Sequence, residues 1–162
     1  MKLEESYLAR RRFLGGMIGA GTAALAAGAG VPLAYYAGNL REEPPPPFLE
    51  IPQSECDLRP GKARLILYGR IPALVVRTPE PESTWKVFVA MCTHFDCTVG
   101  YREKDNCISC ACHGGHYDLE GNVTAGPPPR PLRRFHHAFR DGNLVIALEK
   151  ENLERALRKS DA

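Results

Sequence analysis

The body of this sequence lacks a block of basic residues, a second long apolar run and a haem-attachment motif, and its formal net charge is only +2. Mixed charges of this kind give nucleic-acid binding no support. One long apolar run provides at most one membrane span. These absences exclude a basic nucleic-acid-binding protein, a membrane protein with several spans and a chain that attaches its own haem.

The 162 residues divide by composition into an N-terminal segment of about forty residues and roughly 110 residues for one compact domain, which is near the usual domain size. Six cysteines are unusual for a cytosolic domain of this size, and the even count suggests pairing once metal ligands are subtracted. We expect five parts: a cytoplasmic segment (1–12), an anchor or export signal (13–38), a Pro-rich hinge (39–47), a folded domain (48–148) and a helical tail (149–162).

A long uncharged run follows three arginines near the N-terminus. Residues 13–40 carry no charge and are rich in Ala and Gly, and about twenty apolar residues cross a bilayer as a helix. Because Arg10, Arg11 and Arg12 precede the run, the positive-inside rule places the N-terminus in the cytoplasm. The same pattern resembles a twin-arginine export signal. Three interpretations remain open: an uncleaved anchor, which we favour because the run is longer than a typical signal core, a cleaved signal, and a buried soluble helix.

Four consecutive prolines, Pro44 to Pro47, follow this segment. They favour an extended polyproline II conformation that rises about 3.1 Å per residue. The prolines are either a plain spacer or a stiff arm that moves about a flexible segment at residues 39–43.

Short apolar runs punctuated by Gly, Pro and Asp predict strands in the rest of the chain. They cover residues 63–68, 73–77, 86–91, 106–109, 136–140 and 144–148. Asp141-Gly142 indicates a hairpin. Such short spacings leave no room for crossover helices, so we expect a mainly antiparallel all-β domain. Residues 149–159 predict an amphipathic surface helix, and Trp85, Phe88 and Val89 are expected in the core.

Two clusters of cysteine and histidine are the most specific signal. Residues 92–97 read CTHFDC and residues 110–115 read CACHGG. Each cluster supplies one Cys/His pair and one further cysteine. Two thiolates and two imidazoles can complete the coordination of two sulfide-bridged irons, and they carry less negative charge than four thiolates, so the reduction potential is higher. Such a centre can accept electrons from mild reductants such as quinols.

Two other interpretations of these clusters are open. A Cys-X-His with a Cys-X-X-His could instead hold zinc in a tetrahedral site, although zinc leaves Cys97 and Cys112 unexplained. Ordinary structural cysteines with incidental histidines are the second alternative. The joint spacing favours the iron–sulfur interpretation over both.

In these two clusters the chain resembles the Rieske iron–sulfur proteins. The extra cysteine in each cluster resembles the pair of extra cysteines found in the quinol-oxidising branch of that family. The resemblance implies an antiparallel β-sandwich with a small cluster-binding subdomain (loops at about 91–130), preceded by a transmembrane helix. It also implies one 2Fe-2S cluster, with Cys92 and Cys110 as ligands of one iron and His94 and His113 as ligands of the other. It further implies a disulfide between Cys97 and Cys112. Residues similar to the family's cluster-covering proline loop are Gly126, Pro127, Pro128 and Pro129.

Several positions depart from the family pattern. Phe95 stands where leucine is usual and Asp96 where glycine is usual, so we expect the apolar cover and the backbone turn of the first loop to differ from those of the family. Ala111 stands where proline is usual. Gly115 stands where high-potential members carry a serine whose hydroxyl donates to a bridging sulfide. Tyr117 matches the second family donor, toward the Cys92 sulfur. Loss of one donor lowers the potential, which favours menaquinol over ubiquinol as the substrate.

The resemblance implies a Rieske subunit of a quinol to cytochrome c reductase, which takes an electron and a coupled proton from quinol. His113 is the expected quinol contact, with His94 also at the tip. A cytochrome b-type subunit, a c-type cytochrome acceptor and the lipid bilayer are the expected partners. The chain is then a single-pass protein of the bacterial inner membrane with its domain on the periplasmic side. The rival function is the small subunit of an arsenite-oxidase-like molybdenum enzyme; a membrane-tethered zinc module is the third hypothesis.

The remaining cysteines and histidines carry weaker predictions. Cys56 and Cys107 either pair with each other or remain buried thiols, because the sequence does not say whether their Cα atoms come within about 7 Å. His116, His136 and His137 are expected to be surface or hydrogen-bonding residues.

Overall fold

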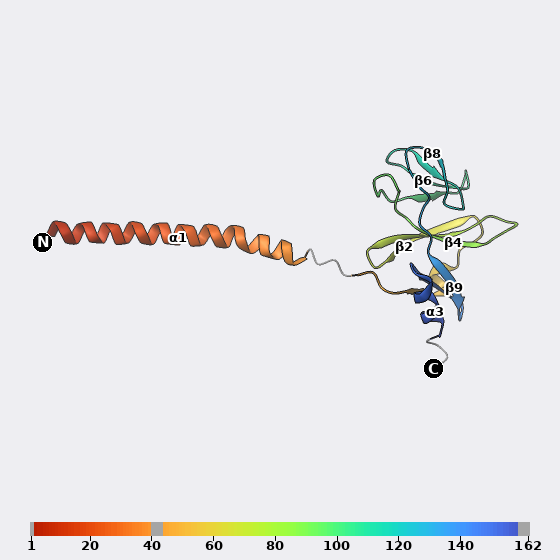
Figure 1. Ribbon diagram of the computed structural model, residues 1–162, viewed down its shortest axis with the longest axis horizontal. Coiled ribbons are helices and arrows are strands. Elements are labelled where there is room, and N and C mark those ends of the chain that lie inside the picture. The colour runs from red at the N-terminus through yellow and green to blue at the C-terminus, as the bar shows by residue number, and fades with distance from the viewer. Residues whose placement is uncertain (1, 40–43, 159–162) are drawn as a thin grey trace. The chain divides into compact units, whose positions relative to one another are not determined.

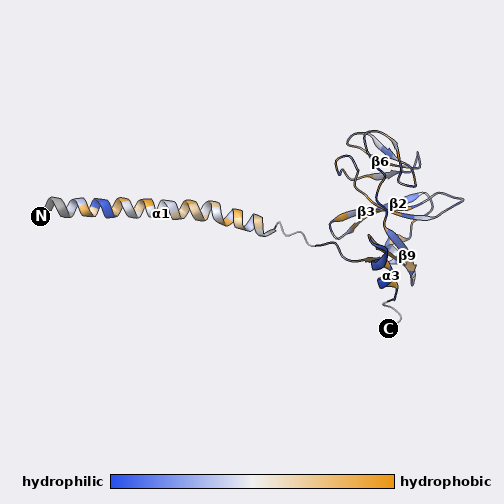
Figure 2. Cartoon of the chain, viewed as in Figure 1, coloured by the Kyte–Doolittle hydropathy of each residue, from blue (hydrophilic) through white to orange (hydrophobic). Residues whose placement is uncertain are grey.

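The computed structural model describes residues 2–39 and 44–158, and the chain divides into two compact units at residues 43 and 44. The first unit is one helix, α1 (Lys2–Asn39). Its segment Ser6–Gly38 is apolar and long enough to cross a membrane, and Figure 2 shows a hydrophilic stretch near its start followed by mainly apolar residues. Arg10 and Arg11 lie within this helix, so the arginines and the apolar run form one continuous element.

The second unit is built from three antiparallel sheets, as Figure 1 shows. Their strand orders are β1–β10–β9, β2–β3–β4 and β5–β6–β7–β8. The strands are β1 (Leu49–Ile51), β2 (Lys62–Tyr68), β3 (Ile71–Arg77), β4 (Trp85–Val89), β5 (Gly100–Arg102), β6 (Cys107–Cys110), β7 (Gly115–Tyr117), β8 (Val123–Ala125), β9 (His136–Arg140) and β10 (Asn143–Ala147). Two short helices, α2 (Gln53–Cys56) and α3 (Lys150–Arg158), accompany them. The predicted antiparallel all-β domain is confirmed.

Strand β3 joins the two apolar cores of this unit. Successive side chains of a strand point to opposite faces, and β3 is buried on both faces from Ala73 to Val76. Ala73 and Val75 pack in a core with residues of β1, β4 and β10. Leu74 and Val76 pack in a second core that also contains Cys92, Cys110 and Tyr117. The predicted metal-binding loops are therefore anchored on the second core.

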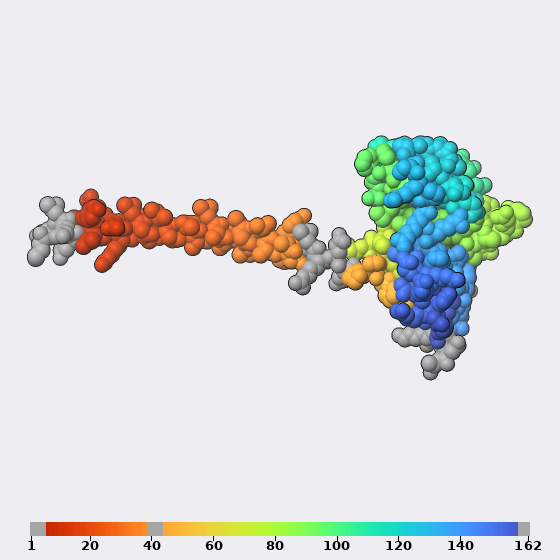
Figure 3. Space-filling view, viewed as in Figure 1, coloured from red at the N-terminus to blue at the C-terminus, as the bar shows by residue number. Residues whose placement is uncertain are grey.

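The sheet β5–β6–β7–β8 carries these loops at one end of the unit. Its registers are short, with Tyr101 opposite Ile108 and Cys110 opposite Gly115. Buried Val99, Ile108 and Tyr117 attach the sheet to the second core. In Figure 3 the cyan surface, which corresponds to residues near 110–130, gathers at this end.

The predicted strands agree with the structure apart from shifts at their ends, whereas β1, β5, β7 and β8 were not predicted. The predicted hairpin is present: Arg140 pairs with Asn143 across Asp141 and Gly142, which both have positive φ angles (51° and 82°), as a type I′ turn requires. Phe88 is fully buried, and Trp85 and Val89 pack against the first core. Helix α3 is amphipathic, as expected, and buries Leu153 and Ala156.

The proline segment, residues 44–47, contacts the folded part of the second unit, which is called the head. The Tyr68 hydroxyl donates to the Pro46 carbonyl, and a Cβ added at Gly69 would lie 2.9 Å from Pro46 Cδ. Pro44 onward accordingly belongs to the second unit. The predicted hinge 39–47 thus combines docked prolines with residues 40–43, which lie outside the described residues, and its bending stays a prediction.

Candidate metal centre

The first predicted cluster of ligands lies on a closed loop between β4 and β5. A bridge between Met91 and Thr98 closes its base, and the Cys92 amide donates to the Cys97 carbonyl at 2.8 Å. Asp96, which stands where glycine is usual, has φ 54°. Asp tolerates this left-handed conformation better than most residues, so the turn is made without glycine.

The second loop joins β6 to β7 and is a tight turn. Cys110 ends β6 and pairs with Gly115 at the start of β7, and Gly114 supplies the positive φ (66°) that the turn requires. His113 is exposed on this turn, whereas Cys110 and Gly115 are buried. The second cluster therefore presents its histidine outward and its first cysteine inward.

The four predicted ligands converge from the two loops. The ring centroids of His94 and His113 are 4.9 Å apart and their planes are nearly perpendicular. Cys92 and Cys110 are both free thiols that are buried in the same apolar core. Two adjacent thiols beside two adjacent imidazoles fit the donor set that a mixed-ligand diiron cluster needs.

An unpaired nitrogen supports the same fit. Within the part of the chain that the structure describes, His94 Nδ1 is the only buried side-chain nitrogen or oxygen without a hydrogen-bond partner. A buried polar atom without a partner is costly. A metal bound at this nitrogen would satisfy it, and the His113 ring lies beside that of His94.

The disulfide predicted from the family resemblance is confirmed. Cys97 and Cys112 are bonded, with their Cα atoms 6.6 Å apart. The sulfurs of Cys97, Cys110 and Cys112 lie within 4.8 Å of one another. This trio is not a metal site, because two of its sulfurs are consumed by the disulfide. The bond instead ties the tips of the two loops together beside Cys110.

Tyr117 places a hydroxyl donor beside the first thiol. Its oxygen lies 3.4 Å from Cys92 Sγ and 3.1 Å from the amide nitrogen of Thr93, which donates to it. Burial alone would raise the pKa of the Cys92 thiol, but hydrogen bonds from Tyr117, from the backbone of His94 and Phe95 and from Cys110 together hold that pKa below its ordinary value. Burial first, and then the bond to Cys92, raise the pKa of Tyr117. The Cys92 thiolate is therefore easier to form than the thiolate of a free cysteine, which suits a metal ligand, and the raised pKa of Tyr117 favours its protonated form, which can donate.

The proline loop (residues 126–129) lies against residues 110–115, the second Cys/His box, whereas residues 92–97 form the first box. Pro128 is its only buried residue; Gly126, Pro127 and Pro129 are exposed. The loop is linked to the first box as well, because Thr93 Oγ1 donates to the Arg130 carbonyl at 2.7 Å. The predicted covering loop is therefore adjacent to both boxes.

Phe95 provides an apolar surface at the tip. Its side chain is 72% exposed, and its ring centroid lies 4.3 Å from that of His94 and 6.2 Å from that of His113. The replacement of leucine by phenylalanine therefore leaves an aromatic ring next to both histidines.

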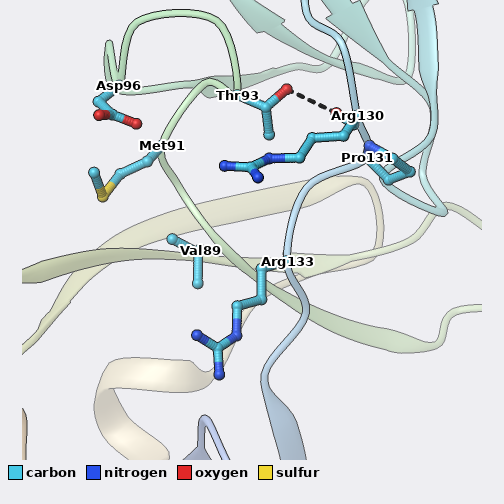
Figure 4. A pocket seen from close by; sticks show the side chains of 7 residues that line it. All are labelled: Val89, Met91, Thr93, Asp96, Arg130, Pro131 and Arg133. Atoms are coloured by element: carbon cyan, nitrogen blue, oxygen red, sulfur yellow. Dashed lines mark hydrogen bonds between the residues drawn. The ribbon is translucent and has the colours of Figure 1, made fainter.

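A cavity of about 460 Å³ lies beside the first loop rather than between the two boxes. Figure 4 shows the Arg130 side chain extending across it toward Met91, with Asp96 at the far side. The residues that line it are Val89, Met91, Thr93, Asp96, Arg130, Pro131 and Arg133. None of the four predicted ligands lines this cavity.

The remaining cysteines and histidines take ordinary roles. All six cysteines lie among the described residues, and Cys56 and Cys107 are free: Cys56 is buried and Cys107 is half-buried. His116 Nδ1 lies 2.9 Å from the Gly114 carbonyl oxygen. His136 is exposed, and burial lowers the pKa of His137. The alternative in which the two leftover cysteines pair is wrong in this structure.

Sequence reasoning missed Thr93, and it named Pro128 only together with the other residues of the proline loop. Thr93 links Tyr117 to Arg130, and its position between two predicted ligands could have drawn attention to it. Pro128 differs from its exposed neighbours only by its burial, and no sequence signal separates it from Pro127 or Pro129.

Comparison with known proteins gives a consistent result. A family described as "Rieske [2Fe-2S] domain" matches residues 51–136. A cytochrome b6-f complex iron-sulfur subunit of Chlorobaculum tepidum is 37% identical over 59 residues, 36% of this chain and 33% of the relative. Iron-sulfur subunit 3 of the cytochrome b6-f complex from Nostoc sp. is 29% identical over an alignment of 174 residues, 97% of this chain and 94% of the relative.

Solved structures agree with the fold. A chain of a hyperthermophilic respiratory Complex III has a TM-score of 0.50 and 27% sequence identity, and the match covers 78% of this chain and 98% of that one. The chain therefore spans nearly the whole of some relatives, but only a third of the length of the Chlorobaculum tepidum protein.

Proposed function

The chain belongs to the Rieske 2Fe-2S family, and from this premise we propose that it is the Rieske subunit of a membrane quinol to cytochrome c reductase of the cytochrome bc type. Relatives that are iron-sulfur subunits of cytochrome b6-f complexes support this class. The observation that carries the proposal is the convergence of two buried thiols and two adjacent imidazoles at an exposed tip.

In this proposal Cys92 and Cys110 hold one iron and His94 and His113 hold the other. The bound 2Fe-2S cluster supplies one-electron chemistry at a higher potential than all-thiolate clusters. The buried state of both thiols and the unpaired Nδ1 of His94 support this division of the ligands. The Cys97–Cys112 disulfide holds the two loops next to each other.

His113 is the proposed contact for quinol, with His94 beside it. His113 is exposed, so its ring can accept a hydrogen bond from a quinol hydroxyl and hold the proton that leaves with the electron. The exposed Phe95 ring next to both histidines gives the apolar quinol ring a surface to pack on.

The hydrogen bonds at the site favour an intermediate potential. Tyr117 lies within reach of the Cys92 sulfur, and a donor to a ligand sulfur stabilises the added negative charge. Gly115 offers no hydroxyl donor. One donor where high-potential members have two is the basis for proposing menaquinol rather than ubiquinol as the substrate.

We further propose that α1 anchors the chain as a single span, with its N-terminus in the cytoplasm and the Rieske domain on the periplasmic side of a bacterial inner membrane. The candidate span Ser6–Gly38, which carries Arg10 and Arg11 near its N-terminal end, supports this topology. The same arginines are the proposed twin-arginine export signal. One span is too little to enclose a quinone, so the partners are a cytochrome b-type subunit and a c-type cytochrome acceptor.

The partners of the native chain decide between the proposal and its rival. A tagged chain is solubilised from its own membranes in mild detergent, and the proteins purified with it are identified together with their haem and molybdenum contents. The proposal predicts a b-type cytochrome and reduction of the iron–sulfur centre by menaquinol. Purification with a molybdenum subunit, and no reduction by quinol, would overturn it in favour of the arsenite-oxidase-like relay.

A further inference from the structure

The proline loop contacts the second box through backbone that carries no side chain. A Cβ added at Gly126 would lie 2.6 Å from the Gly114 carbonyl oxygen and 2.8 Å from Gly115 Cα. Side chains do not fit at such distances. Gly126 also has φ 87°, so its position is fixed both by its own conformation and by the closeness of the facing turn.

Pro128 makes the second close contact. A Cβ added at Gly115 would lie 2.7 Å from Pro128 Cγ, 3.2 Å from its Cδ and 3.6 Å from Cys110 Cβ. The proline ring thus occupies the volume that a side chain at residue 115 would fill. Because the ring is covalently closed on the backbone, it cannot rotate away as a flexible side chain would.

The backbone at residue 115 does not itself require glycine. Gly115 lies in strand β7 and is not among the residues with a positive φ, so its conformation is open to any amino acid. The proline ring alone excludes a side chain there. The absence of a side chain at residue 115 and the burial of Pro128 are therefore one structural feature.

We propose that Gly115 and Pro128 form a mutually exclusive pair: the Pro128 ring excludes water from the Cys110 side of the metal centre only because residue 115 has no side chain. Pro128 is thus a positioning residue: it acts on the metal centre by shielding Cys110 from water. This inference rests on the proposed function for its effect on the cluster, but its steric part concerns this chain alone.

The pair has a defined electrostatic consequence. Solvent exposure and hydrogen bonds to the sulfurs raise the potential of an iron–sulfur centre, because both stabilise the more negative reduced state. A proline ring supplies neither a donor nor access for water. It therefore lowers the potential while it retains the cluster, and the missing hydroxyl at residue 115 and the buried ring act in the same direction.

The test is a double-mutant cycle in the full-length chain, purified with its cluster in detergent. Gly115→Ser adds a Cβ and a hydroxyl, and Pro128→Ala removes Cγ and Cδ, the two atoms that would collide with it. Pro131→Ala is the matched control, because it removes an exposed proline ring outside the covering loop. The readouts are the potential by voltammetry and the rate of loss of visible absorbance in the presence of an iron chelator.

The single and double variants have different expected results. Gly115→Ser alone accelerates cluster loss by about tenfold or more, because overpacking against a rigid ring is strongly unfavourable. Pro128→Ala alone raises the potential, and the combination restores retention and raises the potential further. Pro131→Ala changes neither readout. A Gly115→Ser variant that keeps its cluster like the parent, with additive effects in the double variant, would overturn the pair.

A further measurement separates this inference from the proposed function. The same cycle is run on thermal unfolding of the full-length chain after iron removal, with Gly115→Ala included because it adds a Cβ without a hydroxyl. Pro128→Ala is expected to recover most of the loss of melting temperature caused by either substitution at residue 115. This coupling persists even if the chain does not oxidise quinol, and its absence would refute the steric pair.

Discussion

The hydroxyl oxygen of Tyr117 lies 3.4 Å from the sulfur of Cys92 and accepts the backbone amide of Thr93 at 3.1 Å. Because the amide uses one lone pair of the oxygen, the phenolic proton is free to point at the sulfur. The Thr93 hydroxyl donates to the Arg130 carbonyl, so across the 3.3 Å between their oxygens it can only accept from Tyr117. The phenolic proton therefore has two acceptors, the Cys92 sulfur and the Thr93 oxygen. The second core thus places one hydroxyl donor beside the first thiol.

Replacement of Tyr117 by phenylalanine is expected to lower the reduction potential. The ring stays in the core, and the lost hydroxyl is the one that reaches Cys92 and accepts from the Thr93 amide. A hydrogen bond to a charged group contributes about 1.5–3 kcal/mol. Because about 1.4 kcal/mol is a tenfold change, and a tenfold change corresponds to about 59 mV for one electron, the fall is on the order of 60–130 mV. Tyr101→Phe is the control, because the Tyr101 hydroxyl donates to Asn106 instead. An unchanged potential in the Tyr117 variant would refute the assignment of this donor.

Removal of the disulfide is expected to destabilise the head. Cys97 and Cys112 are 15 residues apart in sequence, and closing a loop of this length contributes about 3 kcal/mol in the chain-entropy model. Cys97→Ala combined with Cys112→Ala should lower the free energy of unfolding by about 2–4 kcal/mol, as measured by denaturant titration of Trp85 fluorescence. Cys107→Ala, at a free and half-buried cysteine, serves as the control. Equal midpoints for the double variant and the parent would contradict the prediction.

The stability of the head is expected to fall below about pH 6.5, in part through His137. Burial lowers the pKa of His137 in the folded chain, so the unfolded chain takes up a proton first as the pH falls. The contribution is fully present above the unfolded pKa of about 6.5 and is lost as the pH falls from there toward the folded pKa. His137→Gln should flatten the pH dependence of unfolding between pH 7.5 and 5, whereas His136→Gln, at an exposed neighbour, should not. Parallel profiles for the parent and His137→Gln would contradict this account.

The docking of the proline segment is expected to depend on Tyr68. Its hydroxyl donates to the Pro46 carbonyl, so Tyr68→Phe should loosen residues 44–47 while the buried ring keeps its place. Hydrogen exchange of the Phe48 and Leu49 amides, the first donors after the prolines, should become faster. Tyr101→Phe should leave these rates unchanged. Identical exchange in the Tyr68 variant would mean that the contact with Gly69 is sufficient to hold the segment.

The longer strands could be predicted because their signal is local. β3 is a continuous apolar run that is buried on both faces, and the turn at Asp141 and Gly142 is a strong hairpin signal. By contrast, β1, β5, β7 and β8 contain three residues each, too few to show a period. β1 forms by pairing Leu49 with Ile146, a contact between distant parts of the chain that no local pattern encodes.

The positions of the four proposed ligands follow from the sequence, whereas their surroundings could not be predicted. Cys92, His94, Cys110 and His113 occupy short loops in which spacing alone brings pairs together. The contact between Gly115 and Pro128 depends on the path of a loop that returns from β8, and its distance is set by tertiary packing. For the same reason the sequence indicated a missing hydroxyl at residue 115 but not the ring that takes its place.

Pulsed electron paramagnetic resonance of the reduced protein, labelled with ¹⁵N-histidine, tests the central claim most directly. The account predicts a 2Fe-2S signal with hyperfine coupling to two histidine nitrogens, from His94 and His113. A signal without histidine nitrogen coupling would mean all-thiolate coordination, and a purified chain that contains zinc and no iron would mean that the site is not a redox centre; either result contradicts the account.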